Sequence, residues 1–302
     1  MTPSSSARTR FRAGIAVPLL ALVAAACGAA PGSGTPAPSP TSGTPTPTPS
    51  SAAVLLRVTS EGGFINPVAS LAAVPTIVVY TDGRMFSAGQ PTGENPDPLV
   101  APIAVRSVGA AGEAAIVAAF REAGLDKPAR GGPGVAGDSG TLVFEVSIDG
   151  ATVTTRYAGN GPGSGGPGGP GVGGGDPGRT AALALVDRLL DPAETWGAAS
   201  APAFTYEPTA FKIYAAPGAP PVDPSASEPP VAWPLTTTLA TFGSPAVPDR
   251  GVSGLRVAVI GGADGAAIAP VLAAASSGTA FTSDGQPFTL YVRPLLPDEA
   301  GG

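Results

Sequence analysis

The sequence predicts an α+β fold, with small antiparallel sheets packed against helices, in two subdomains that follow a disordered N-terminal tether. Asp-Gly pairs begin at Asp82, Asp149 and Asp284, between apolar runs rich in β-branched and aromatic residues. Such pairs are the strongest short-range signal for a β-hairpin, so we expect a hairpin at each. Other segments carry apolar residues at helical spacing, which predicts helices packed against these hairpins.

The N-terminal residues 1–26 have the pattern of a lipoprotein signal peptide. Arginines at positions 8, 10 and 12 precede an apolar run, and small residues precede Cys27, the one cysteine of the chain. We therefore expect cleavage before Cys27 and lipidation of its thiol, with acyl chains that include palmitate. The lipid-attachment box has Ala24 where leucine is usual. The alternative is an ordinary secretory leader cut near Ala26, which would leave a free cysteine.

Residues 27–52 form a predicted tether rich in Pro, Thr, Ser, Gly and Ala. This composition cannot bury enough apolar surface to offset the entropy of ordering, so we expect the tether to stay extended. Alternating Pro and Thr favour the polyproline II conformation. A diacylglyceryl group on Cys27 would anchor the chain firmly, because two acyl chains suffice. The expected location is the outer face of the cytoplasmic membrane.

The first subdomain is expected at residues 53–158. Strands are predicted at residues 54–59, at 76–80 and 84–86 around an Asp-Gly turn, near 103–105, and at 141–148 and 152–157 around another. A helix is predicted over residues 110–123, with Ile116 and Phe120 on its apolar face and Gly124 at its C-terminal end.

A flexible insertion of glycine and proline is predicted at residues 159–178, and the second subdomain at 179–302. The second subdomain should contain a helix over 180–190, strands near 204–206, 211–214 and 255–260, and a helix over 264–275 capped by Asp264. Pro270 predicts a kink in that last helix. A hairpin of residues 281–282 and 288–293 closes the chain.

Composition excludes several kinds of site. The chain contains no histidine, which removes the commonest general base, pH switch and metal ligand. Once Cys27 is lipidated, no thiol remains for catalysis or zinc binding. Removing the three leader arginines leaves 13 basic against 22 acidic residues, a net charge of −9. This acidic balance argues against nucleic acid as a partner. We predict no cofactor, no metal and no catalytic residue set.

Local matches to catalytic motifs have simpler explanations. Residues 137–140 (GDSG) copy the surroundings of the nucleophile in trypsin-like proteases, but that chemistry requires a histidine. A turn before a strand accounts for them. Residues 259–265 (VIGGADG) join a strand to a helix as nucleotide-binding loops do, but Ala263 and Ala266 replace two fingerprint glycines. Lys127 and Lys212 lack the spacing of a serine–lysine hydrolase.

The motifs at residues 231–235 (VAWPL) and 293–299 (RPLLPDE) resemble a family of secreted or lipid-anchored actinobacterial proteins of unknown function. The order of strands, Asp-Gly turns and helix over residues 76–157 is similar to that family as well. The resemblance implies no activity. Members often carry cysteines near the positions of Gly251 and Gly302, so a disulfide typical of the family would be missing here.

These observations leave the function open between two classes. The first hypothesis is a non-enzymatic binding or envelope-assembly module whose partner is an envelope protein or glycan, contacted by Trp196, Tyr206 and Trp233. The second is a carboxylate-dependent hydrolase acting on envelope glycans, with Glu145 and Glu207 as candidate members of an acid pair about 5–9.5 Å apart. A solute-capture lipoprotein is a third, although the strand–helix alternation of two-lobed binders is missing.

Overall fold

The computed structural model describes residues 52–61, 70–89, 97–127, 141–158, 177–191, 193, 194, 196, 204–220, 228–246 and 252–300. The predicted signal peptide, Cys27 and nearly all of the tether lie outside these residues, as does most of the glycine-rich insertion. Residues 47–302 belong to one compact unit. The described part of that unit is α+β, with three helices and two largely antiparallel sheets, which confirms the predicted fold class.

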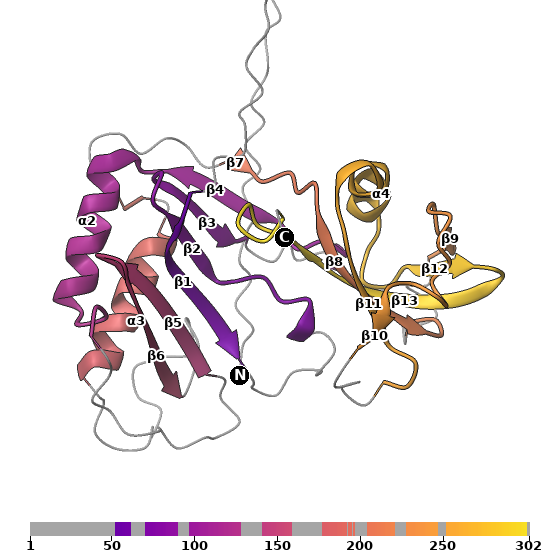
Figure 1. The fold of residues 1–302 in the computed structure, drawn as a ribbon, viewed down its shortest axis with the longest axis horizontal. Coiled ribbons are helices and arrows are strands. Elements are labelled where there is room, and N and C mark those ends of the chain that lie inside the picture. Colours follow the sequence, from indigo (N-terminus) through magenta and orange to yellow (C-terminus); the bar gives the residue numbers. More distant parts are fainter. Residues whose placement is uncertain are drawn as a thin grey trace, which may run out of the picture. The chain divides into compact units, whose positions relative to one another are not determined.

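The first sheet has the strand order β6-β5-β1-β2-β3-β4-β7, and every pairing in it is antiparallel (Figure 1). Its strands are β1 (Val54–Glu61), β2 (Ile77–Tyr80), β3 (Arg84–Ala88), β4 (Ile103–Ser107), β5 (Thr141–Ile148), β6 (Ala151–Ala158) and β7 (Phe204–Thr205). Two of the predicted Asp-Gly turns join neighbouring strands here. In the turn between β5 and β6, Asp149 and Gly150 have φ values of 53° and 76°, the left-handed conformation that such pairs tolerate.

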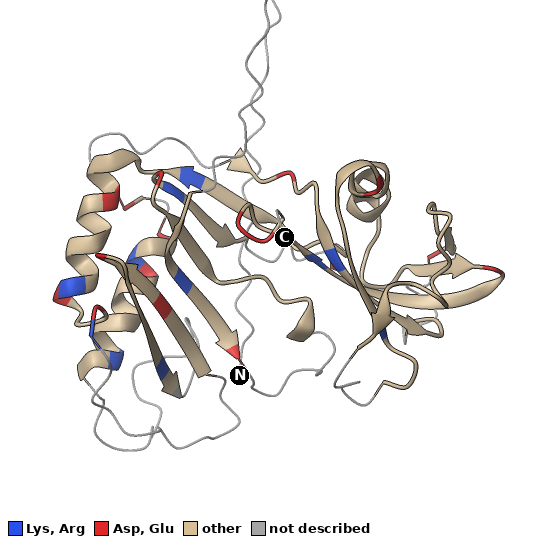
Figure 2. Cartoon of the chain, viewed as in Figure 1, with Lys and Arg blue, Asp and Glu red and all other residues tan. Residues whose placement is uncertain are grey.

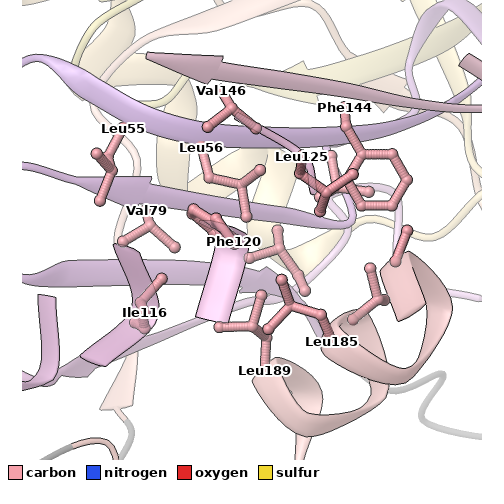
Figure 3. Close-up of a cluster of buried hydrophobic side chains, with 14 of the residues drawn as sticks. Leu55, Leu56, Val79, Ile116, Phe120, Leu125, Phe144, Val146, Leu185 and Leu189 are labelled. Carbon is pink, nitrogen blue, oxygen red and sulfur yellow. The ribbon is translucent and has the colours of Figure 1, made fainter. Parts of the chain in front are cut away.

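Helices α2 (Gly109–Glu122) and α3 (Pro177–Leu190) cover one face of this sheet. Figure 3 shows Phe120 of α2 beside Leu56 and Val79 of the sheet, with Leu189 of α3 in the same cluster, and all four side chains are almost fully buried. The predicted apolar face of α2 is therefore the one that packs. Helix α3 begins at Pro177, a residue suited to a first helical turn, and not at the predicted position 180.

The second sheet has the strand order β10-β11-β8-β13-β12-β9. Its strands are β8 (Phe211–Pro217), β9 (Val231–Ala232), β10 (Ser244–Pro245), β11 (Arg256–Ile260), β12 (Ala280–Ser283) and β13 (Gln286–Pro294). Only β9 and β12 pair in parallel among the described strands. The third predicted hairpin joins β12 to β13, with φ values of 51° at Asp284 and 73° at Gly285.

Helix α4 (Gly262–Ala274) packs on the second sheet through Ile268 and Leu272, which are both fully buried. Its N-cap is Gly261, whereas the sequence analysis expected Asp264 in that position. Pro270 does lie inside the helix, as expected. Pro270 is exposed, so it is not part of the helix face that packs on the sheet.

The predicted division at residues 159–178 stays a prediction, because that tract lies almost wholly outside the described residues. Two elements that the sequence analysis assigned to the second subdomain belong with the first sheet. Helix α3 contributes Leu185, Val186 and Leu189 to the core under β1 and β5, and β7 pairs with β4. Helical periodicity predicts an element but not which sheet it will cover.

The chain after β13 leaves the second sheet and packs on the first. Leu296 is 1% exposed and lies among Val78, Tyr80 and Phe86, on the face of the first sheet opposite α2 and α3. The Leu295 amide donates to the Ala210 carbonyl at 2.9 Å, just before β8. The C-terminal segment therefore joins the two sheets.

A group of charged and phenolic side chains holds this segment, and we call it the C-terminal charge cluster: Arg57 of β1, Tyr80 of β2, Arg293 of β13, Asp298 and Glu299. Arg57 donates to Glu299 at 2.9 Å and also pairs with Asp298. Arg293 pairs with Glu299, and the Tyr80 hydroxyl donates to Asp298. Figure 2 shows the acidic loop at the C-terminal end of the chain. The polar residues of the RPLLPDE motif, Arg293, Asp298 and Glu299, therefore form ion pairs within the fold.

The electrostatics of the cluster favour the ionised form of Glu299. Burial by itself would raise the pKa of this carboxyl. The charge of Arg293, the Leu296 N–H at 3.1 Å and Arg57 outweigh burial, so the pKa of Glu299 lies below its ordinary value. Burial and the hydrogen bond to Asp298 raise the pKa of Tyr80, which keeps that hydroxyl protonated as a donor.

We predict that Glu299→Gln lowers the free energy of unfolding by about 2 kcal/mol at neutral pH, since it weakens charge-assisted hydrogen bonds. Because the folded-state pKa of Glu299 lies below the ordinary 4.5, its contribution is complete above that pH and is lost as the pH falls through the folded-state value. Urea unfolding followed by tryptophan fluorescence from about pH 7 to about pH 3 should therefore show a shallower loss of stability in the variant than in the wild type.

The matched control is Glu122→Gln, at an exposed position of α2 that makes no ion pair with the described residues. Its pH profile should follow that of the wild type. Identical profiles for Glu299→Gln and the wild type would contradict the role assigned to the cluster.

Candidate binding cleft

A cleft of about 580 Å³ opens where β4, β7, β8 and α4 approach one another. It is lined by residues 100–103, 205–209 and 211, with Ala269, Pro270 and Ala273 of α4 and Pro294 of β13. Pro270 and Ala273 of α4 are exposed, so this wall of the cleft is accessible to solvent. Both sheets and a helix therefore contribute to one concave surface.

The lining is mainly prolines and small aliphatic side chains, with polar groups confined to residues 205–209. Tyr206 is half-buried in this wall. Its ring meets Phe86 edge to face, with 5.2 Å between ring centroids, and its hydroxyl donates to the Leu295 carbonyl at 3.1 Å. These contacts fix the orientation of the ring. They also attach the cleft wall to the C-terminal segment that the charge cluster holds.

The segment that carries these polar residues is fixed on both sides. The Tyr206 amide donates to the Ile103 carbonyl at 2.8 Å, which extends the pairing of β7 with β4. On the other side, α4 approaches the Thr209 carbonyl so closely that a Cβ at Gly265 would lie 2.2 Å from its oxygen. Only glycine allows this approach, so Gly265 lets α4 lie directly against the backbone of Thr209.

Among the described residues that line the cleft, Glu207 is the only one with a charged side chain. Its side chain is exposed. No described residue forms an ion pair with it. The cleft thus offers one carboxylate beside an apolar surface, with no neighbouring acid in its described lining to form a catalytic pair.

The two candidate acids are not brought together. Glu145 lies on β5, and Glu207 follows β7 by two residues. Five inter-strand steps separate β5 from β7 in the first sheet. At a strand spacing of about 4.8 Å these steps span about 24 Å. A glycosidase pair requires about 5–9.5 Å, so Glu145 and Glu207 cannot act on one bond.

The three aromatic residues expected to contact a partner have different environments. Trp196 is 2% exposed, and the Arg188 guanidinium lies 4.8 Å from its ring centroid. Trp233 is 8% exposed and its indole N–H donates to the Thr237 carbonyl at 2.8 Å. Because both tryptophans are buried, neither side chain is available as a surface contact for a partner. Residue type alone cannot distinguish a core aromatic residue from an exposed one, which is why the sequence indicated them as contacts. Tyr206 does line the cleft.

The wall contributed by α4 was missed in the sequence analysis. The sequence feature that could have indicated this wall is a helix with alanine and proline on the face opposite its buried face. Such a face has no recognisable ligand chemistry until another element lies opposite it. Within the described residues, no group of three or more His, Cys, Asp or Glu could hold a metal ion. None of the helices described is long and apolar enough to cross a membrane.

Comparison of the chain with models of protein families, with curated proteins and with solved structures finds no match. The resemblance of the VAWPL and RPLLPDE motifs to a secreted or lipid-anchored family stays a prediction.

We predict that Gly265→Ala destabilises the fold by about 1–3 kcal/mol, because the added Cβ forces α4 away from Thr209. The higher helix propensity of alanine, worth about 1 kcal/mol, acts in the opposite direction and does not remove the clash. The matched control is Gly261→Ala, whose Cβ would meet Ala210 at 3.4 Å, an ordinary contact. Chemical denaturation of both variants checks this, and equal stabilities would contradict the close approach.

Proposed function

We propose that this protein is a membrane-anchored, extracytoplasmic, non-enzymatic binding module whose cleft holds a small apolar molecule at the cell envelope. The observation that carries this proposal is the cleft itself: about 580 Å³ of open, mainly apolar space between fixed elements. Ligand sites in proteins are typically concave, apolar and about 300–1,000 Å³, with a few polar groups that orient the ligand. The polar residues 205–209 along one wall fit that description.

The position of the acids favours binding over catalysis. Glu145 and Glu207, the candidate acids for glycan cleavage, lie about 24 Å apart by strand spacing. Among the described residues that line the cleft, Glu207 is the only acid. Burial of an apolar ligand supplies affinity without any chemical step, at about 25 cal/mol per Å² of apolar surface removed from water.

The anchor in this proposal rests on the sequence of residues 1–52. A lone cysteine after a basic and apolar leader, followed by a Pro- and Thr-rich tether, supports attachment to the outer face of the cytoplasmic membrane. There the tether would hold the cleft away from the bilayer.

We predict that Ala273→Trp abolishes binding of a neutral apolar probe such as phenylbutanol, because the indole would fill the cleft from an exposed position of α4. The matched control is Ala267→Trp, exposed on the same helix but outside the lining, which should bind as the wild type does. Isothermal titration calorimetry measures both, with at least a tenfold loss of affinity expected for Ala273→Trp, or about 1.4 kcal/mol. Equal binding by the two variants would place the ligand elsewhere.

We predict that Cys27→Ala releases the protein from the membrane fraction, since the thiol that would carry the acyl chains is removed. Metabolic labelling with an alkyne fatty acid and cell fractionation measure the two effects separately. Ser33→Ala, in the tether, is the control and should stay labelled and membrane-bound. A wild-type chain that is unlabelled and soluble would refute the anchor without affecting the cleft.

A further inference from the structure

The carboxylate of Glu207 stands out among the acids near the cleft because nothing described neutralises it. Asp298 and Glu299 are engaged in the C-terminal charge cluster. Glu228 does not line the cleft, and it accepts hydrogen bonds from Ser276 and Thr279. Glu207 accepts no side-chain hydrogen bond from the described residues and is exposed on the cleft wall.

The basic side chains of Arg84, Arg293 and Lys212 interact with residues other than Glu207. Arg84 pairs with Asp82 at 2.6 Å, and Arg293 pairs with Glu299. Lys212 adjoins Phe211, which lines the cleft, but successive side chains of a strand point to opposite faces. The Lys212 ammonium accordingly lies 5.4 Å from the ring centroid of Tyr214, another residue of β8. The electrostatic sign of the cleft is therefore set by Glu207.

The apolar and charged parts of the cleft lie side by side. Ala269, Ala273 and Pro102 supply aliphatic surface, and Glu207 stands between the exposed residues Thr205 and Thr209 in the polar segment. A ligand seated against the aliphatic side chains would bring its polar end towards this carboxylate. A carboxylate and hydroxyl groups accept hydrogen bonds, and an ammonium group has three donors.

We propose that the ligand is an apolar primary amine, whose hydrocarbon body occupies the aliphatic part of the cleft and whose ammonium group pairs with Glu207. This rests on the proposed function, because it identifies the charge of the ligand that the same cleft holds. The Tyr206 ring also lines the cleft, and an aromatic face attracts cations. An apolar carboxylate of the same shape is repelled, so Glu207 determines specificity by excluding anions as well as by attracting amines.

The preference is modest in size and depends on salt. Glu207 is exposed, and a solvent-exposed ion pair contributes little to the free energy of binding. We therefore expect the amine to bind only about threefold to fivefold more tightly than a neutral ligand. Raising the ionic strength from about 0.05 M to about 0.5 M screens an exposed pair and should remove most of that gain. Contacts with the aliphatic wall do not weaken with salt in this way.

The test is calorimetry on the full-length chain carrying Cys27→Ala, titrated with phenylbutylamine, phenylbutanol and phenylbutanoate. These probes share one apolar body and differ in charge. The amine should bind about threefold to fivefold more tightly than the alcohol at low salt, and the acid more weakly than the alcohol. Glu207→Gln should bind the amine and the alcohol equally. Glu145→Gln, an exposed glutamate on β5, is the matched control and should keep the preference.

Equal binding of the three probes to the wild type would overturn the amine specificity and leave the apolar cleft standing. A preference that survives Glu207→Gln would overturn the role of this residue. Amine binding that persists in Ala273→Trp would place the amine outside the cleft and overturn the proposal. Failure of all three probes to bind would overturn both this inference and the proposed function.

Discussion

The pairing of Arg57 with Asp298 and Glu299 is the interaction on which the arrangement of this protein depends. It binds the end of the chain, which has just left the second sheet, to a strand in the middle of the first sheet. Desolvating these charges has a cost that ion pairing alone rarely exceeds. The burial of Leu296 in the same segment supplies apolar stabilisation, so the charges mainly select one position for the segment that the apolar contact holds.

The cleft is a consequence of that docking. Its walls come from both sheets, and the Tyr206 hydroxyl reaches the carbonyl of Leu295 within the docked segment. Gly265 then fixes how closely α4 approaches the same wall. A concave surface built this way is preformed, which reduces the entropy lost when a ligand binds. Glu145 and Glu207 are widely separated in the first sheet, so these two described acids do not form the pair that glycan cleavage would require.

The sequence motif that carried the resemblance has a structural explanation in this chain. Arg293, Asp298 and Glu299 bind one another or the first sheet, and Leu296 is in its core. In the other motif, Trp233 packs edge to face on Phe242 and Phe281. Both motifs therefore stabilise the fold, and the residues proposed to bind ligand lie elsewhere, in a short polar segment without a recognisable pattern. This explains why sequence reasoning found Tyr206 and Glu207 only as separate candidates.

The sequence by itself determined the α+β class, the hairpins at Asp149 and Asp284, and the approximate extents of α2 and α4. These features follow from turn chemistry and side-chain periodicity, which act between residues close in the chain. The tertiary structure decided that α3 covers the first sheet, that both tryptophans are buried, and that Pro270 faces a cleft. Those outcomes depend on apolar contacts and ion pairs between residues far apart in the chain, and such contacts leave no period or local signature in the sequence.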